Sequence, residues 1–202
     1  DAAESLHPGS GKFLPGVILY RQRDHAAVAY PSRRHPAATV ATSGCGPTAL
    51  SMVLANLLGL DISPAETAAF ALEHGARAEG GTNLRRLAAQ AALRWPLTVA
   101  ETCGTAELVA ALQGGAMAIC NTAGDRPGRK GVFSSGGHYV VAAGGDKQCL
   151  LVLDPGIYPG KYKAAHRAEA VTVFGDALLC SPETLEQDCA GRSPRYYIFR
   201  RG

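Results

Sequence analysis

The chain has 202 residues, of which 47% are hydrophobic and 18% are charged, and its formal net charge is +3. This composition is too apolar for a disordered chain and the length allows a substantial core, so we expect a single domain over residues 1–202 and a monomer. Basic residues are scattered and no apolar stretch reaches the roughly 18 residues of a membrane helix, so neither nucleic-acid binding nor a membrane span is predicted.

The first 60 residues combine loops with one strongly apolar segment. Residues 1–12 are polar and small and are expected to form a flexible arm. Val17–Tyr20 is a candidate strand that leads to Gln22. The run A-L-S-M-V-L-A-N-L-L predicts a buried helix over about 47–58, which Gly59 ends.

A second helix carries clear end signals. Ser63 is suited to the N-cap, Pro64 follows it in the first turn, and Glu66 completes a capping box. Gly75 marks the end of this helix.

The chain continues with two more helices and a strand. Thr82 or Asn83 caps a helix over residues 84–94, and residues 97–101 read as a strand. Another short helix begins at Thr105 and ends at a glycine pair.

The second half is rich in β-forming residues separated by glycine loops. A short helix capped by Ser181 interrupts these strands. The predicted strands are 116–121, 138–143, 150–154, 171–174 and 196–200. We therefore predict an α+β fold, with a helical lobe over about 45–115 packed on an antiparallel sheet over about 116–202.

Six cysteines are too few for a disulfide framework in a chain of this length. A metal site is not expected either, because no C-x-x-C pair or Cys/His cluster with zinc-ligand spacing occurs. Neither a metal nor an organic cofactor is predicted. Cys120 and Cys149 lie in apolar runs and fit buried positions. Cys180 and Cys189 flank a short polar segment, and a disulfide between them in an oxidising compartment is one hypothesis.

Cys45 stands apart from the other cysteines. It lies in S-G-C-G-P-T, directly before the predicted buried helix. A nucleophilic cysteine acts as a thiolate, which the dipole and free N–H groups of a helix N-terminus stabilise. Glycine on both sides would let a substrate backbone approach. The alternative is a simple turn before a core helix.

His138 and Asp154 are the candidate partners of Cys45. His138 begins an apolar strand after Ser-Ser-Gly-Gly, a position from which an imidazole reaches a cleft as a general base. Asp154 ends the next strand, and a hairpin between the two strands brings these far ends together. Asp146 is the competing acid, but it falls in the hairpin turn. The other five histidines read as surface residues.

These motifs in this order, G-C-G-P-T, G-H-Y-V-V and L-D-P-G, resemble papain-like peptidases of the bacteriocin-processing (double-glycine) family. The stand-alone, non-transporter branch is the more similar. The resemblance covers about 22–162 and includes the P-A-E-T-A segment and the Gly80-Gly81-Thr82 turn. It implies a papain-like fold, a Cys45-His138-Asp154 triad and a glutamine in the oxyanion hole.

Gln22 is the glutamine that matches the stand-alone branch. Transporter-linked members carry their glutamine six residues before the cysteine, where this chain has Thr39. A surface position for Gln22 is therefore the alternative.

The substrate-binding residues are expected among the glycine-rich loops. Gly44, Gly81 and Gly137, with Thr82, suggest a narrow cleft for small residues near the cut. The 121–137 loop is either a mobile flap or a solvated connection, and we favour the connection.

The function expected from the residues and the resemblance is hydrolysis of a peptide or protein substrate by a cysteine peptidase or amide hydrolase. Two alternatives are open: an acyltransferase similar to phytochelatin synthases, and a peptide-binding module with a degenerate site. The missing initial methionine and the resemblance favour an exported bacterial protein, in the cell envelope or outside the cell, while a cytoplasmic location is not excluded.

Overall fold

The computed structural model of the chain describes residues 16–202, so the arm predicted over residues 1–12 lies outside the described range. A seven-stranded antiparallel sheet runs through the molecule in the order β3-β9-β4-β5-β6-β8-β7. Its strands are β3 (Leu97–Thr102), β4 (Met117–Thr122), β5 (His138–Gly145), β6 (Leu150–Leu153), β7 (Thr172–Phe174), β8 (Ala177–Cys180) and β9 (Tyr196–Arg201).

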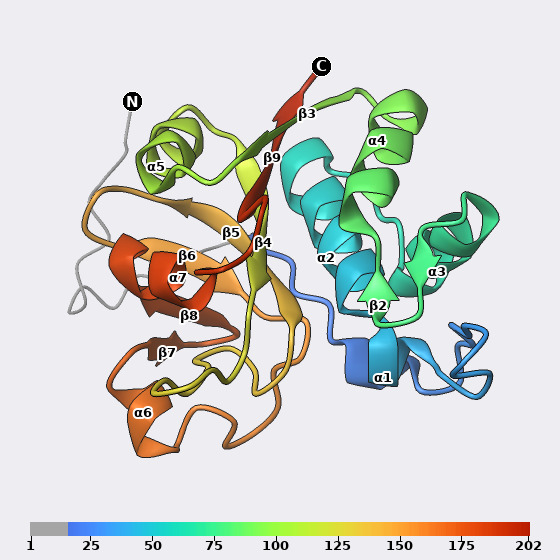
Figure 1. Cartoon of the computed structure of the whole chain (residues 1–202). Coiled ribbons are helices and arrows are strands. Elements are labelled where there is room, and N and C mark those ends of the chain that lie inside the picture. The colour runs from blue at the N-terminus through green and yellow to red at the C-terminus, as the bar shows by residue number, and fades with distance from the viewer. Residues whose placement is uncertain (1–15) are drawn as a thin grey trace.

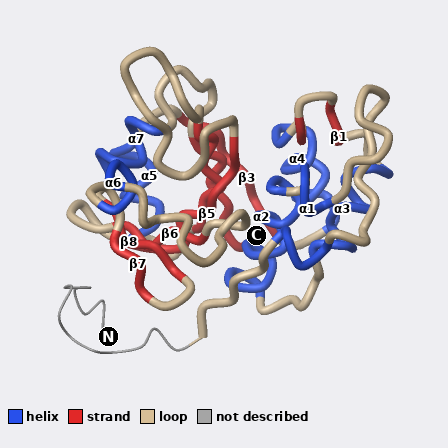
Figure 2. Tube along the Cα trace, turned by 90° about the horizontal axis from the view of Figure 1, so that it is seen from below, coloured by secondary structure: helices blue, strands red, loops and turns tan. Residues whose placement is uncertain are grey.

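Helices cover both sides of this sheet (Figures 1 and 2). On one side lie α1 (Val40–Ser43), α2 (Cys45–Val53), α3 (Pro64–Glu73) and α4 (Leu84–Arg94), together with a small ribbon of β1 (Arg77–Ala78) and β2 (Gly81–Thr82). On the other lie α5 (Thr105–Gln113), α6 (Ala165–Ala168) and α7 (Pro182–Asp188). Helix α2 packs on β4 and β5, so the start of α2 lies against the central strands.

Two apolar clusters hold these layers together, and the central strands contribute to both. Ile119 and Val141 belong to the cluster under α2, α3 and α4. Their neighbours Cys120 and Val140 belong to the cluster under α5 and α7. Successive side chains of a strand point to opposite faces. Strands buried on both faces therefore have continuous apolar sequences, as in Met117–Cys120 of β4 and throughout β6.

The helix predicted over about 47–58 is confirmed, but it begins two residues earlier. Helix α2 starts at Cys45 and continues into a π-helical turn over Leu54–Leu58. Gly59 ends it at φ +72°, a conformation that costs glycine little. The capping box of α3 is also confirmed, since Ser63 and Glu66 bond reciprocally.

Other predictions need correction. Val17–Tyr20 forms no strand within the described part of the chain, and the Ile18 N–H donates instead to Asn56 Oδ1 at 2.7 Å. A 3₁₀ helix over Gln22–His25 follows it. The boundary between the lobes lies before β3 rather than near residue 116, because β3 pairs with β9 and α5 packs on β5. Strand β8 has no counterpart among the predicted strands.

The 121–137 connection is tethered to α7 rather than free. Arg126 donates to the carbonyls of Ala190 and Gln187, and the buried Asp188 accepts from the backbone of Val132 and Phe133. These contacts favour a fixed connection over a mobile flap.

Cys180 and Cys189 are both buried free thiols, so the disulfide hypothesis for them is wrong in this structure.

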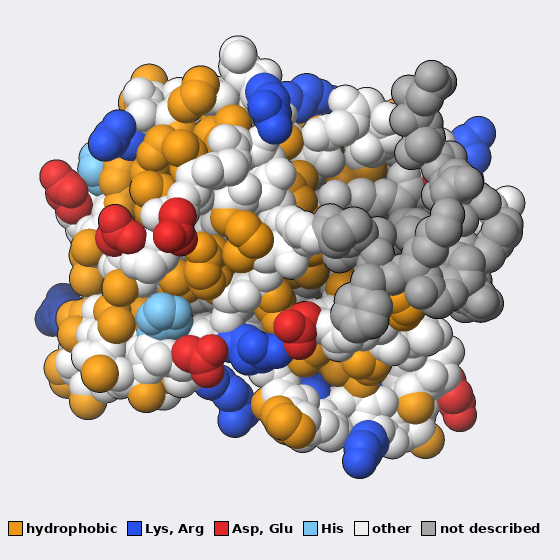
Figure 3. Space-filling view, turned by 180° about the vertical axis from the view of Figure 1, so that it is seen from behind, with side chains coloured by type: hydrophobic (Ala, Val, Ile, Leu, Met, Phe, Trp, Pro, Cys, Tyr) orange, Lys and Arg blue, Asp and Glu red, His pale blue; other side chains and the backbone are white. Residues whose placement is uncertain are grey.

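The surface opposite to the view of Figure 1 carries acidic and basic side chains intermixed rather than gathered by sign (Figure 3). Among residues 16–202 no helix is long and apolar enough to cross a membrane.

Candidate active site

Cys45 is the first residue of α2, and close packing leaves no room for a side chain on Gly44 or Gly46 beside it. A Cβ on Gly44 would lie 2.6 Å from Val40 Cγ1, and one on Gly46 would lie 2.7 Å from Thr82 Cβ. Both distances are shorter than real Cβ contacts. The glycines therefore let α1, α2 and β2 pack closely around Cys45, a reason different from the substrate approach expected from the sequence.

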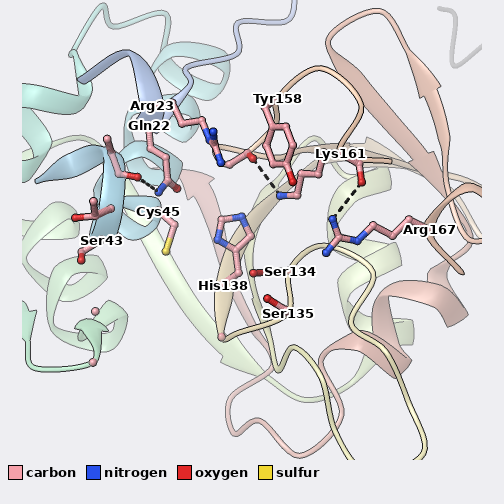
Figure 4. A pocket seen from close by; sticks show the side chains of 16 residues that line it. Gln22, Arg23, Ser43, Cys45, Ser134, Ser135, His138, Tyr158, Lys161 and Arg167 are labelled. Atoms are coloured by element: carbon pink, nitrogen blue, oxygen red, sulfur yellow. Dashed lines mark hydrogen bonds between the residues drawn. The ribbon is translucent and has the colours of Figure 1, made fainter. Parts of the chain in front are cut away.

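His138 and Asp154 meet as the hairpin predicts. Strands β5 and β6 are antiparallel, with Val141 opposite Leu153, so the start of β5 lies beside the end of β6. His138 Nε2 is 2.7 Å from Asp154 Oδ1. This bond occupies Nε2, so Nδ1 is the ring nitrogen left for Cys45 (Figure 4).

Asp154 is fully buried and accepts four hydrogen bonds. Oδ1 accepts from His138 and from the Gly156 N–H at 2.8 Å. Oδ2 accepts from Lys161 Nζ at 2.5 Å and from the Tyr162 hydroxyl at 2.6 Å. A buried carboxylate is stable only when its lone pairs are satisfied, and here both oxygens are.

The pKa values of Cys45 and His138 move in the directions that favour an ion pair. Burial raises the pKa of the Cys45 thiol, but hydrogen bonding to His138, its charge, and the N–H groups of Tyr139 and Gly46 outweigh burial and bring that pKa below its ordinary value. Burial lowers the pKa of His138, but Asp154 and then Cys45 raise it to about 9. The site thus stabilises thiolate and imidazolium together.

Four other cysteines have pKa values that move in the opposite direction. Burial raises the pKa of Cys120 to about 12, and it also raises the pKa values of Cys149, Cys180 and Cys189.

Gln22 lies beside Cys45 in the same cavity rather than on the surface (Figure 4). Its Nε2 donates to the Ala41 carbonyl at 2.9 Å, which leaves one amide hydrogen for another acceptor. Its backbone N–H donates to the carbonyl of Pro155 at 2.8 Å. This second bond ties Gln22 directly to the residue after Asp154.

The expected substrate-binding residues divide into two pairs. Gly81 and Gly137 line the cavity beside Cys45. Gly44 is the N-cap of α2, and Thr82 is buried behind the cavity with its hydroxyl 2.8 Å from the Tyr30 hydroxyl. Neither of this second pair lines the cavity.

Several cavity residues were not predicted from the sequence. They are Arg23, Ser134, Ser135, Tyr158, Lys161 and Arg167. The only local sequence signal for any of these residues is that Lys161 follows a Pro-Gly turn shortly after Asp154. On its own, a lysine in such a position is typical of a solvated loop.

Asp146, the competing acid, and His74, one of the five other histidines, both lie away from Cys45 and bond locally. Asp146 accepts from the backbone of Gln148 and Cys149 inside the hairpin turn. His74 Nδ1 lies 2.9 Å from the carbonyl of Phe70 at the end of α3. Within the described residues, no group of three or more His, Cys, Asp or Glu side chains is suited to hold a metal ion.

Fold and site together define an α+β, papain-like architecture, in which a helix presents a cysteine to a histidine on a sheet. The same architecture occurs in the peptidase domain of Streptococcus ComA, a bifunctional ABC transporter involved in a quorum-sensing pathway, at a TM-score of 0.52 and 17% identity over 80% of this chain and 93% of that one. It also occurs in a C39-like peptidase from Bacillus anthracis, at a TM-score of 0.57 and 15% identity over 94% of this chain and 96% of that one.

The likeness is confined to structure. No family profile and no curated protein matches the sequence. The papain-like fold, expected from the resemblance of three short motifs to bacteriocin-processing peptidases, is thus confirmed by the structural comparison.

Proposed function

We propose that this chain is a cysteine peptidase or amide hydrolase that acts through Cys45, His138 and Asp154. The observation that carries the proposal is the hydrogen bond between His138 and the buried Asp154, because His138 lines the same cavity as the Cys45 thiol at the start of α2. The C39 peptidases with the same fold support it.

In the first step the Cys45 thiolate attacks the carbonyl carbon of the scissile amide. The carbonyl π electrons move to oxygen, and the Cys45 N–H with the free hydrogen of Gln22 Nε2 would hold that oxyanion. His138 then donates its Nδ1 proton to the departing nitrogen, the C–N bond breaks, and a thioester forms.

In the second step water replaces the amine. Neutral His138 removes a proton from water, and the hydroxide adds to the thioester carbonyl. Collapse of this intermediate releases the carboxylic acid and restores the thiolate and imidazolium. Asp154 keeps Nε2 protonated and stabilises the imidazolium throughout.

Peptide-bond cleavage is tested with a randomised peptide library analysed by mass spectrometry, with and without hydroxylamine or a thiol as a competing nucleophile. We expect free carboxylic-acid products that are absent with Cys45→Ala. Products transferred to the added nucleophile in preference to water would instead support the acyltransferase alternative. No Cys45-dependent product of either kind would contradict the proposed function.

We expect the pH profile of kcat/KM to be bell-shaped. As the pH rises through the pKa of Cys45, which lies below the ordinary 9.0, the thiolate forms and the rate increases. As the pH rises past about 9, the His138 imidazolium loses the proton that the leaving nitrogen needs, so the rate falls. Initial rates with one cleaved peptide give the profile, and circular dichroism at each pH excludes unfolding. A rate that keeps rising beyond about pH 10 would contradict this ion pair.

A further inference from the structure

The charged side chains that line the cavity beside Cys45 are all basic. Besides His138 they are Arg23, Lys161 and Arg167, and none of the lining residues in the described chain is an aspartate or a glutamate. Asp154 lies just behind the lining, but its two oxygens are already occupied by four donors. The cavity therefore presents positive charge without an acidic side chain to balance it.

The three cations differ in how their charge is compensated. Lys161 is 6% exposed and forms a 2.5 Å ion pair with Asp154, so its charge is largely neutralised. Arg23 and Arg167 form no ion pair with any residue in 16–202. The uncompensated charge thus belongs to the two guanidinium groups.

Both guanidinium groups are held in place by neutral partners. The Arg23 guanidinium lies over the Tyr158 ring, 4.3 Å from its centroid. Arg167 Nη1 donates to the Lys161 carbonyl at 3.1 Å, and its nitrogen-bearing end points into the cavity (Figure 4). Fixed guanidinium groups lose little entropy when they bind a planar carboxylate.

Arg167, and the Tyr158 ring over which the Arg23 guanidinium lies, are on the side where the leaving portion of a substrate must be. Cys45 and Ser43 come from the helical side, whereas Tyr158, Lys161 and Arg167 lie beyond His138 (Figure 4). The acyl part becomes bonded to the thiol, while the nitrogen that departs receives its proton from His138. The residues beyond His138 therefore face the part that is released as the amine.

We propose that this part of the cavity, defined by Arg23, Tyr158 and Arg167, binds a carboxylate on the leaving portion of the substrate. The cavity volume is about 320 Å³, at the low end of ligand pockets, so the carboxylate lies within about two residues of the cut. It is either the C-terminal carboxylate of a short leaving portion or an acidic side chain. The proposal rests on the proposed hydrolase function and specifies its substrate class.

The test uses four peptide pools with the same randomised acyl portion. Their leaving portions are Gly with a free carboxylate, Gly amide, Glu amide and Gln amide. We expect kcat/KM for the free-carboxylate or the Glu pool to exceed that of its amide counterpart by about tenfold or more, as charge-assisted hydrogen bonds imply. Which pair shows the preference identifies the source of the carboxylate. The preference should weaken at high salt.

The double variant Arg23→Gln/Arg167→Gln should bring both ratios close to one. Arg200→Gln, an exposed arginine of β9 outside the cavity, is the matched control and should keep the wild-type ratio. Thermal unfolding of each variant establishes that the fold is intact. Ratios near one in the wild type, or a wild-type preference retained by the double variant, would overturn the carboxylate proposal alone. Absence of Cys45-dependent cleavage in every pool would overturn the hydrolase function as well.

Discussion

The Cys45→Ala variant should lose peptide hydrolysis by roughly four to six orders of magnitude while keeping its fold. The loss is that large because the thiolate supplies the bond-forming electrons and no other cysteine takes its place in the cavity, as far as the described residues show. The half-buried Cys45 contributes little packing, so the thermal unfolding midpoint should stay close to that of the wild type. Turnover of a cleaved peptide and thermal unfolding are the two measurements.

Cys103→Ala is the matched control, because Cys103 is an exposed free cysteine outside the cavity. It should retain full turnover. Iodoacetamide near pH 6 should modify Cys45 much faster than Cys103 in the wild type, because alkylation requires a thiolate. Equal labelling of the two cysteines, or turnover that survives in Cys45→Ala, would be incompatible with an activated nucleophile at this position.

The placement of Cys45, His138 and Asp154 can be predicted from the sequence because the signals for it are local. Gly-Cys-Gly-Pro marks a helix start, and the hairpin between His138 and Asp154 has a short turn that fixes which strand ends meet. The same reasoning placed the end of α2 at Gly59 and the cap of α3 at Ser63, since both depend on residues a few positions apart.

The residues around Cys45, His138 and Asp154 are brought there by contacts that no local sequence pattern encodes. Gln22 reaches the cavity through its bond to Pro155, far along the chain. Arg167 enters it from a four-residue helix after a long loop. The segment Val17–Tyr20 has the composition of a strand, but its Ile18 backbone bonds to the Asn56 side chain instead of a strand partner. Tertiary contacts override β propensity there.

Asp154→Asn should lower both stability and activity, with a stability loss of about 3–5 kcal/mol. An asparagine has one acceptor oxygen, so its NH₂ group must face existing donors, either His138 with Gly156 or Lys161 with Tyr162. Because the ion pair and hydrogen bonds hold the pKa of Asp154 well below 3.8, its contribution is present above that pH and is lost as the pH falls. Urea unfolding near neutral and acid pH measures this loss.

Lys161→Met separates the structural part of that loss from the catalytic part. In Lys161→Met the Asp154 carboxylate still accepts from three donors. In Asp154→Asn the buried Lys161 ammonium has no carboxylate partner, so Lys161→Met should lose less stability than Asp154→Asn. The double variant should therefore be more stable than Asp154→Asn alone, with a non-additive coupling of about 1–3 kcal/mol. Turnover should stay low in the double variant, because the imidazolium of His138 still lacks its carboxylate. Wild-type turnover in the double variant would contradict the role of Asp154 in holding His138. An Asp154→Asn variant as stable as the wild type would contradict the stabilising ion pair between Asp154 and Lys161.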